Sequence, residues 1–437
     1  MTQDPLHLIC IEPHFPGRLG LVADWLVRRR GYRCWFYCAS GDSQDRWPAS
    51  VGKGLDIVQF GVATESAVPW MRHLERGLCY AYSAWAVLES RRPRPVDLVL
   101  GRSAGLGSTL FVPSLYAGTP IVNLFDYFYH PRAHDLAAEA RADMPPEYYN
   151  WRRSANAMDL LDLENGVTAW TRTLWQRDLY PAEYRDDFVV QYDGVQAPQS
   201  EKKGTGPLSS RGPGPLTGSR QIAGRTIPPD TRVVSFVSQA LDRLRGFDRF
   251  IELANRLMRW SSNVLCVAVG GPVVQRGLDV DFFNKDYSAQ VLANSPAFAP
   301  ERLWMPGTMS RADVGNLLAI SDLHIYPSRA YPVASSMVEA LASGCVVLAW
   351  DSVPVQEFIA HGRTGLLVPC TDMDAAEDAA RSVLLDPVGH QPIGQAAAEL
   401  VRQRYSQEVT MPAVAALFTR LVNGGLTGQK SKVKSQK

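Results

Sequence analysis

The residues best suited to chemistry lie close together in the second half of the chain, within the segment 326–369. Ser335 and Ser336 come directly before an apolar run with helical spacing, where a helix presents unpaired backbone N–H groups and the positive end of its dipole. Such an end suits a diphosphate. Glu339 lies about one turn further in, and a lone carboxylate among apolar residues is not an ordinary core residue. We expect it to accept hydrogen bonds from ribose hydroxyls; an incidental acidic residue is the alternative.

Two arginines, Arg243 and Arg245, stand in the segment SQALDRLRGF, between a predicted strand and a predicted helix. Guanidinium groups next to a helix start are suited to phosphate binding through paired hydrogen bonds. Two solvated arginines in a loop are the alternative interpretation.

Several turns could let a ligand approach the backbone closely. Gly271 ends a very apolar strand, and Met305 and Gly307 flank a proline after the next one. Gly17 and Gly20 lie in FPGRLG, at the start of a predicted helix. Taken by themselves, the first two segments are more simply explained as ordinary turns. The fingerprint G-x-G-x-x-G is absent from FPGRLG, so dinucleotide binding loses support.

Polar and aromatic residues also follow strands of the first half. Arg102 and Asp126 stand at strand exits, where open α/β sheets place functional groups. Nearby aromatic residues could form a surface that stacks on sugar rings, or could simply pack in the core: Tyr127, Phe128, Tyr129 and Trp151.

The elements that must position these residues follow from the spacing of apolar residues and from turn residues. In the first half we predict strands at 7–12, 33–39, 97–101 and 120–125, and helices at 21–30 and 147–164. In the second half we predict strands at 232–237, 264–270, 302–305, 324–326 and 346–349, and helices at 247–260, 310–319 and 336–342. This alternation predicts an α/β protein with two Rossmann-like domains, whose parallel sheets face each other across a cleft.

Length and composition agree with two globular domains. The chain has 437 residues, 46% hydrophobic and 20% charged, and its net charge of +1 gives no case for nucleic-acid binding. Seven scattered cysteines indicate buried thiols in a reducing compartment. With neither a leader peptide nor a long apolar stretch in view, we expect a cytoplasmic protein. The basic tail is expected to be solvated, with weak peripheral membrane contact as the alternative.

The segment 326–369 resembles the nucleotide-sugar site of family 4 retaining glycosyltransferases, which have the GT-B fold. Their typical run is E-P-F-G-x-x-x-x-E-A-x-A-x-G-x-P-V-V; here 331–334 is YPVA and 339–344 is EALASG. Tyr331 stands where the family has the first glutamate of its E-x7-E pair, so the usual carboxylate contact with the donor sugar is missing. The RGF at 245–247 resembles a bacterial sub-group that also lacks this glutamate.

The resemblance implies a role for each candidate residue. Arg245 matches the second of the family's two basic residues, which neutralise the leaving diphosphate; the first is replaced by Gln239 or Ala240, and Arg243 would compensate for it. Asp126 would position the acceptor hydroxyl or stabilise charge at the anomeric carbon. A helix-capping or turn role is the alternative for Asp126. Donor binding is implied for Gly17, Gly20, Gly271, Met305, Gly307, Tyr331, Ala334, Ser335, Ser336 and Glu339.

The resemblance also implies domain roles. We expect an acceptor-side domain at 1–197, a flexible Gly/Pro/Ser-rich connection at 198–229 and a nucleotide-sugar-binding domain at 230–410. A helix at 411–425 would pack back on the first domain, and 426–437 would be a disordered basic tail.

Together these features predict a retaining glycosyltransferase without metal or further cofactor. It would transfer a sugar from a UDP- or GDP-linked donor to a hydroxyl of a glycan, a lipid-linked or another acceptor. The alternatives are a nucleotide-sugar epimerase of the same architecture and a non-catalytic descendant that only binds a nucleotide sugar or a partner.

Overall fold

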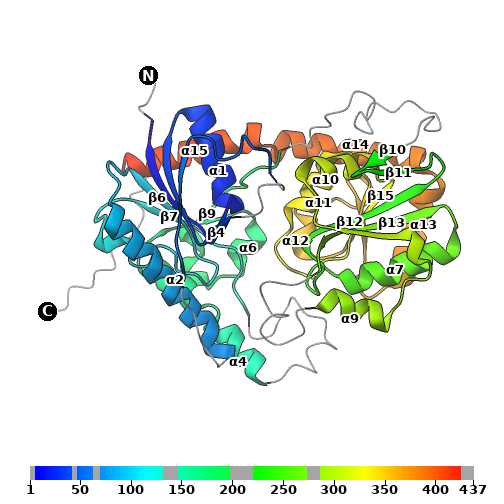
Figure 1. The fold of residues 1–437 in the computed structure, drawn as a ribbon, viewed down its shortest axis with the longest axis horizontal. Coiled ribbons are helices and arrows are strands. Elements are labelled where there is room, and N and C mark those ends of the chain that lie inside the picture. The colour runs from blue at the N-terminus through cyan, green and yellow to red at the C-terminus, as the bar shows by residue number, and fades with distance from the viewer. Residues whose placement is uncertain are drawn as a thin grey trace. The chain divides into compact units, whose positions relative to one another are not determined.

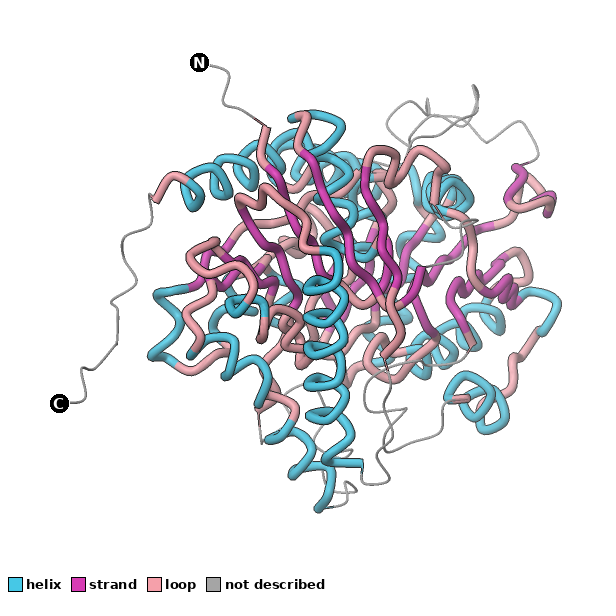
Figure 2. Tube along the Cα trace, turned by 60° about the vertical axis from the view of Figure 1, so that its left-hand side comes forward, coloured by secondary structure: helices cyan, strands magenta, loops and turns pink. Residues whose placement is uncertain are grey.

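The computed structural model describes residues 5–41, 47–62, 69–130, 146–196, 220–272 and 286–424. The chain forms two compact units (Figures 1 and 2). Of the described residues, the first unit contains those up to 194 together with 407–424, and the second contains 195–406. The predicted basic tail and the part of the predicted connection at 198–219 lie outside the described residues.

The first unit has a seven-stranded parallel sheet in the order β5-β3-β1-β6-β7-β8-β9. Its strands are β1 (His7–Ile11), β3 (Arg33–Cys38), β5 (Leu55–Gln59), β6 (Leu98–Arg102), β7 (Ile121–Leu124), β8 (Thr168–Thr171) and β9 (Phe188–Val190). Its helices are α1 (Gly17–Arg30), α2 (Pro69–Arg91), α4 (Pro146–Ser154), α5 (Ala157–Glu164), α6 (Leu174–Asp178) and α15 (Gln407–Val422). A short parallel pair joins β2 (His14–Phe15) to β4 (Ser40–Gly41).

Side chains of β1 alternate between two apolar cores, as the period of two in a strand requires. Leu8 and Cys10 pack with α1 and with α15, which joins this core through Met411 and Phe418. Ile9 and Ile11, which alternate with them along the strand, pack with α2 on the other face. Helices therefore cover both faces of the sheet, which explains why four of the five residues of β1 are buried.

The second unit has a six-stranded parallel sheet in the order β14-β13-β12-β15-β16-β17. Its strands are β12 (Arg232–Ala240), β13 (Val264–Gly271), β14 (Leu303–Gly307), β15 (Leu323–Tyr326), β16 (Val347–Trp350) and β17 (Leu366–Val368). Its helices are α7 (Phe247–Trp260), α9 (Tyr287–Asn294), α10 (Arg311–Ile320), α11 (Ser335–Ala342), α12 (Val353–Gln356), α13 (Met373–Leu385) and α14 (Pro387–Arg404). One core joins β12, β13, β15 and β16 to α7, α9 and α13.

The prediction of two α/β domains with parallel sheets is confirmed. The start of the first helix was predicted wrongly, because α1 begins at Gly17 and not near residue 21. The carboxylate of Glu12 accepts the backbone N–H groups of Arg18 and Leu19 at 3.2 and 2.8 Å, and so supports this first turn from outside the helix. No local signal reveals such a contact.

Two further boundaries differ from the predictions. The end of the predicted flexible connection is the antiparallel hairpin of β10 (Arg220–Ile222) and β11 (Arg225–Ile227), with Ile222 and Ile227 buried. The second unit ends at Ser406 instead of residue 410, because α15 already begins at Gln407 and packs in the first core.

The predicted helix at 147–164 is two helices, α4 and α5. Between them, Asn156 uses its side chain to bind the backbone of Tyr129 twice, at 2.8 Å each. The junction between the two helices is thus fastened to a segment that lies far away in the sequence.

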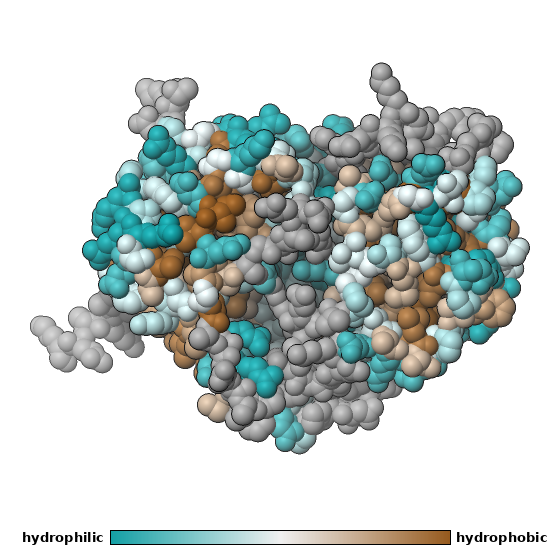
Figure 3. All heavy atoms as spheres, in the orientation of Figure 1, coloured by the Kyte–Doolittle hydropathy of each residue, from teal (hydrophilic) through white to brown (hydrophobic). Residues whose placement is uncertain are grey.

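Apolar side chains reach the viewed surface of each unit in small separate groups (Figure 3). Among the described helices, none is long and apolar enough to cross a membrane. The seven cysteines are free thiols, five of them buried.

Candidate functional site

The carboxyl edge of the second sheet brings most of the predicted donor-site residues together. Along the sheet, chain order runs outward in both directions from β12 and β15. Parallel α/β sheets bind ligands beyond the carboxyl ends of the strands at such a reversal. Arg245 follows β12 and Tyr331 follows β15, and their segments lead into α7 and α11 respectively.

Arg245 is held at this point by groups that follow β15. Its Nη1 donates to the hydroxyl of Tyr326 at 3.0 Å and to the carbonyl of Pro332 at 2.9 Å. Its backbone N–H donates to Asp242 Oδ1 at 2.7 Å. The charge predicted to meet a diphosphate is therefore fixed beside the loop that leads into α11.

Tyr331, which was predicted to stand in place of a glutamate, contacts the same arginine. The centre of its ring lies 5.3 Å from the guanidinium carbon of Arg245. A carboxylate at this position would cancel the charge of the guanidinium, whereas an aromatic ring attracts a cation and leaves its charge in place. With Tyr331 at this position, the charge of Arg245 is not cancelled by residue 331.

Arg243 is placed differently from Arg245. Its guanidinium carbon lies 4.8 Å from the ring centre of Tyr287, at the start of α9. Its carbonyl accepts a hydrogen bond from Arg329, whose guanidinium also pairs with Asp248 at 3.3 Å. The two predicted phosphate-binding arginines therefore contact different elements of the second unit.

The helix α11 begins at Ser335 without a side-chain cap. Just before it, the N–H of Ala334 donates to the hydroxyl of Tyr326 at 3.0 Å. The hydroxyl of Ser336 donates to the carbonyl of Val237 at 2.8 Å and so fastens the helix to β12. This hydroxyl is therefore structural, and the backbone N–H groups of the first turn remain the candidates for phosphate binding.

Glu339 is shielded from bulk solvent and paired with an arginine. Its side chain is 13% exposed, and Oε1 lies 3.0 Å from Nη2 of Arg311. Arg311 opens α10, whose cap is Ser310; the hydroxyl of Ser310 accepts the N–H of Asp313 at 3.1 Å. The ion pair connects the predicted ribose ligand to the helix that follows β14, the strand in which Met305 and Gly307 were predicted to bind the donor.

The predicted backbone ligands end the two neighbouring strands. Gly271 ends β13, and its carbonyl accepts the N–H of Leu241 at 2.9 Å. Gly307 ends β14 with φ +78°, a conformation that favours glycine. The side chain of Met305 packs against the core, so only its backbone can meet a ligand.

In the first unit, charged residues gather at the carboxyl edge of the sheet. Arg102 ends β6, and its Nη1 donates to Oε1 of Glu12, just after β1, at 2.6 Å. Its Nη2 pairs with Asp126, which lies two residues beyond β7. The structure therefore brings together the two strand-exit residues that the sequence predicted separately.

Asp126 is surrounded by positive charge. Burial alone would raise its pKa, but the charges of Arg102, Arg172 and Arg18 outweigh burial, so the pKa of Asp126 lies below its usual value. Its second oxygen, Oδ1, is buried without a hydrogen-bond partner among the residues that the structure describes. At neutral pH Asp126 is thus an ionised hydrogen-bond acceptor, and a weak base.

The amino end of α1 is already occupied by a carboxylate of the chain itself. Glu12 accepts two of its N–H groups, as described above, and a Cβ atom at Gly17 would lie 2.3 Å from Oε2 of Glu12. The contact with Glu12 therefore explains why a glycine stands at position 17. The prediction that Gly17 and Gly20 bind the donor loses two of the amides on which it depends.

The interpretation of the aromatic residues as an acceptor surface is wrong for two of the four. Tyr127 and Trp151 are 4% and 1% exposed, so they belong to the core. The ring of Trp151 packs edge-on against Tyr129 at 5.0 Å.

Both halves of the chain match known families. Residues 219–400 match the family model described as glycosyl transferases group 1, and residues 30–199 match that of a glycosyl transferase family 4 group. Glycosyl transferase models therefore match both halves of the chain.

Solved structures show the same fold for this glycosyltransferase. Sucrose-phosphate synthase of Thermosynechococcus elongatus is 14% identical with a TM-score of 0.69, and the match covers 96% of this chain and all of that one. HepE of Anabaena, solved with UDP-glucose, is 16% identical with a TM-score of 0.64 and coverages of 95% and 99%. WaaG, a glycosyltransferase involved in lipopolysaccharide biosynthesis, is 16% identical with a TM-score of 0.62 and coverages of 95% and 100%. No curated protein sequence matches the chain.

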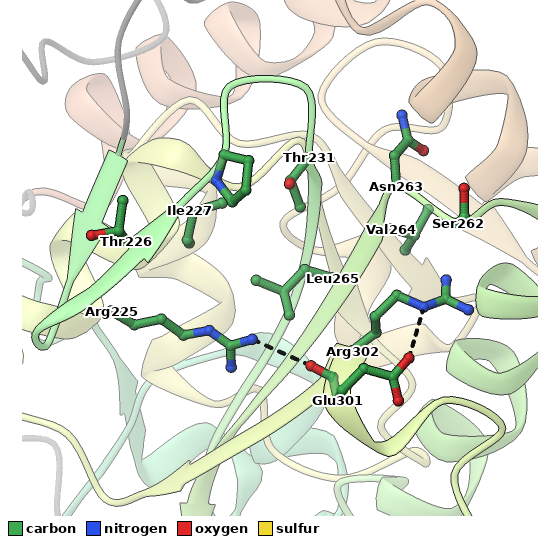
Figure 4. A pocket seen from close by; sticks show the side chains of 11 residues that line it. Arg225, Thr226, Ile227, Thr231, Ser262, Asn263, Val264, Leu265, Glu301 and Arg302 are labelled. Carbon is green, nitrogen blue, oxygen red and sulfur yellow. Dashed lines mark hydrogen bonds and ion pairs between the residues drawn. The ribbon is translucent and has the colours of Figure 1, made fainter.

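A pocket of about 150 Å³ in the second unit of the glycosyltransferase lies away from these residues (Figure 4). Thr231 and Asn263 line it at the amino ends of β12 and β13, whereas the predicted donor residues lie at the carboxyl ends. Its two arginines are engaged with Glu301: Arg225 donates to the carbonyl at 3.3 Å, and Arg302 pairs with the carboxylate at 3.6 Å. We therefore assign it no part in sugar transfer.

Three charged residues of the glycosyltransferase sites escaped sequence reasoning: Arg311, Glu12 and Arg172. Arg311 follows a strand, a turn and a serine cap, a pattern that could have marked a residue at the edge of the site. Glu12 ends the first strand run and could have been marked as a strand-exit carboxylate. No metal-binding group of three or more His, Cys, Asp or Glu residues occurs within the described parts of the chain.

Proposed function

We propose that this glycosyltransferase transfers a sugar from a nucleotide-diphosphate donor to an acceptor hydroxyl, with retention of anomeric configuration and without a metal ion. The second unit would bind the donor and the first the acceptor. The proposed location is the cytoplasm, with at most weak contact with a membrane.

The observation that carries this proposal is the start of α11. An uncapped helix end follows β15 at the reversal of strand order, Arg245 is fixed beside it, and the shielded carboxylate of Glu339 lies one turn inside. A diphosphate fits the first two features and a ribose fits the third.

The donor nucleotide is proposed to be UDP-linked, with GDP as the alternative. HepE was solved with UDP-glucose, and this relative shares the fold over 95% of the chain. The proposed acceptor is a glycan, a lipid-linked or another hydroxyl compound. WaaG, which is involved in lipopolysaccharide biosynthesis, supports this class by analogy of fold alone.

In the proposed reaction, the bond between the anomeric carbon and the diphosphate oxygen breaks while the acceptor oxygen bonds to the same face of that carbon. The acceptor proton passes to the departing phosphate. Negative charge grows on the diphosphate, and the guanidinium of Arg245 with the N–H groups of α11 would stabilise it. Because the pKa of Asp126 is lowered, its proposed task is to orient the acceptor or to stabilise positive charge at the anomeric carbon.

The test begins with a thermal-shift screen of UDP- and GDP-sugars on the intact chain, followed by transfer assays in the presence of EDTA. We expect one donor family to raise the melting temperature, and NMR of the product to show retained configuration. Inversion of configuration, or activity lost with EDTA and restored by a divalent ion, would contradict the respective part of the proposal.

The same screen separates the two alternatives. An epimerised donor formed without any acceptor would favour an epimerase. Binding without turnover across many acceptors would favour the binding protein, for which the replacement of glutamate by Tyr331 is the supporting observation.

Glu339→Gln tests the ribose contact. We expect at least a tenfold loss of UDP affinity in calorimetry, because a hydrogen bond to a charged group contributes about 1.5–3 kcal/mol. Thermal unfolding should change little, since the side chain fills no core volume. Unchanged affinity would remove the central assignment.

A further inference from the structure

Two buried aspartates of α5 share one hydroxyl group. The Oγ atom of Ser103 lies 2.8 Å from Oδ1 of Asp159 and 2.8 Å from Oδ2 of Asp162. Asp159 is 1% exposed, and Ser103 and Asp162 are fully buried. Ser103 begins the segment that follows β6.

A serine hydroxyl has one proton and can donate to only one of these carboxyl groups. The contact with the second must then be made by a proton on that carboxyl group, with Ser103 as acceptor. Two ionised aspartates around one donor would leave a carboxylate oxygen facing the lone pairs of the serine, without compensation in a buried place.

The remaining contacts decide which aspartate carries the proton. Asp159 also accepts the N–H of Gly105 at 2.8 Å and the hydroxyl of Tyr180 at 3.0 Å, so with Ser103 it has three donors, as an ionised carboxylate prefers. Asp162 has only the amide of Asn123 besides Ser103, at 3.0 Å. Its other oxygen is buried without a partner among the described residues.

We propose that Asp162 is protonated in weakly acidic solution, that it donates this proton to Ser103, and that it thereby acts as a positioning residue for Arg102. The chain of hydrogen bonds runs from Asp162 through Ser103 to ionised Asp159. These hydrogen bonds hold Ser103 and Gly105, the first and third residues after Arg102.

The connection to Arg102 is short. Ser103 is its direct neighbour, and the backbone N–H of Arg102 donates to the hydroxyl of Ser108 at 2.8 Å, within the same segment. The side chain of Arg102 in turn holds Glu12 and Asp126. The protonation state of Asp162 does not depend on the proposed function, whereas its effect on sugar transfer does.

The electrostatic surroundings agree with this assignment. Burial raises the pKa of Asp162 to about 7, with a further contribution from the charge of Asp159, and burial raises the pKa of Asp159 to about 6. The charge of Asp126, beyond β7, also raises the pKa of Asp159. From α6 and the turn after it, only the neutral hydroxyl of Tyr180 is in contact.

On the side of α2, His73 is a titratable group that lies against the same segment. Its ring lies against Gly105, where a Cβ atom would be 2.1 Å from Nε2. Burial, with the charge of Arg76, lowers the pKa of His73 to about 4. This histidine makes folding more favourable as pH rises from about 4 towards its ordinary pKa, opposite in sign to the aspartates, so the pH dependence of the wild-type protein alone is not diagnostic.

The decisive quantity is the difference in unfolding stability between wild type and Asp162→Asn, measured from pH 4 to 8. The pKa of Asp162 is raised in the folded state, so its contribution is full below its unfolded pKa, near 4, and is lost as pH rises through about 7. The asparagine cannot ionise. The ratio of the two unfolding constants should therefore change by up to about tenfold per pH unit within this window, in favour of the variant at high pH.

Two matched variants complete the comparison. Asp187→Asn, on an exposed residue, should show no such change. Asp159→Asn replaces the acceptor of three hydrogen bonds and should lower stability, and its pH-dependent change should end near pH 6 instead of 7. A pH-independent ratio for Asp162→Asn, or equal profiles for the two buried variants, would overturn the assignment of the proton.

Infrared spectroscopy of the wild type, with isotope-labelled aspartate, gives a second measurement that does not require a stable variant. We expect the C=O band of a protonated carboxylic acid to persist at pH 6 and to disappear above pH 8. Its absence at pH 6 would overturn the proposal.

The positioning role is tested by the pH profile of transfer. Wild-type kcat should fall as Asp162 ionises, and Asp162→Asn should lack this alkaline fall while KM for the donor stays unchanged. An equal reduction at every pH would show a merely structural role. If no donor is turned over at all, the proposed function fails. The stability and infrared results still show whether Asp162 is protonated.

Discussion

At the scale of single residues, a carboxylate that binds a ribose must stay ionised and keep one orientation. Arg311 lies 3.0 Å from Glu339, so we expect it to hold the proposed ribose ligand in one orientation. We expect Arg311→Met to weaken UDP binding about fivefold, since a partly exposed ion pair contributes about 1 kcal/mol. Calorimetry measures this loss. Arg249→Met, which removes a 3.3 Å pair with Glu252 on the surface of α7, is the matched control.

The sugar of the nucleotide gives this prediction a sharper readout. If Arg311 orients Glu339, its removal should reduce the preference for UDP over 2′-deoxy-UDP and not only the affinity for both. A preference that survives in Arg311→Met would mean that the arginine acts on stability or on the phosphates.

Arg245 is expected to act on the transition state more than on the bound donor. Its contacts with Tyr326 and Pro332 hold the charge where the leaving group would gain charge. Arg245→Ala should therefore lower kcat by a larger factor than it raises the donor dissociation constant. Steady-state kinetics combined with calorimetry measures both, and equal factors would contradict this role.

At the scale of elements, the turn between β12 and α7 depends on a glycine. Gly246 has φ +76°, and a Cβ atom there would lie 2.0 Å from the carbonyl oxygen of Pro327, after β15. Gly31, after α1, has φ +70° and open space around it. Gly246→Ala should thus lower stability by more than the roughly 1 kcal/mol of backbone strain expected for Gly31→Ala.

Because Gly246 adjoins Arg245, its substitution should also reduce transfer, while Gly31→Ala should not. Chemical denaturation and the transfer assay give the two readouts. Equal stability losses in the two variants would show that the close approach to Pro327 relaxes at little cost.

At the scale of the whole molecule, the chain returns to its first unit through α15. Phe418 is fully buried there and meets Trp170 edge-on at 5.9 Å. We expect Phe418→Ala to destabilise the first unit by about 3–5 kcal/mol, as for large core residues in general. Val409→Ala, on the same helix but 47% exposed, should have little effect.

Hydrogen exchange read by mass spectrometry locates this effect. Protection should fall in peptides of the first unit, such as β1 and β8, and stay unchanged in β13 and β16 of the second. Equal loss of protection in both sheets would show that the units unfold together.

The sequence by itself determined the parallel α/β character of both units and most strands, because these depend on local apolar spacing. It also determined Glu339, Arg245 and the start of α11 as candidate donor ligands, because a helix end and a strand exit are local features too. The roles proposed for these residues in donor binding are tested by the experiments above.

Only the tertiary structure decided which charges meet. Arg311 reaches Glu339 from 28 positions away in sequence, Glu12 supports α1 and holds Arg102, and Ser103 lies between two aspartates of a later helix. Such contacts join segments that only the folded sheet order makes neighbours. Side-chain pairing across strand ends has no periodicity along the chain, and a sequence pattern therefore cannot contain it.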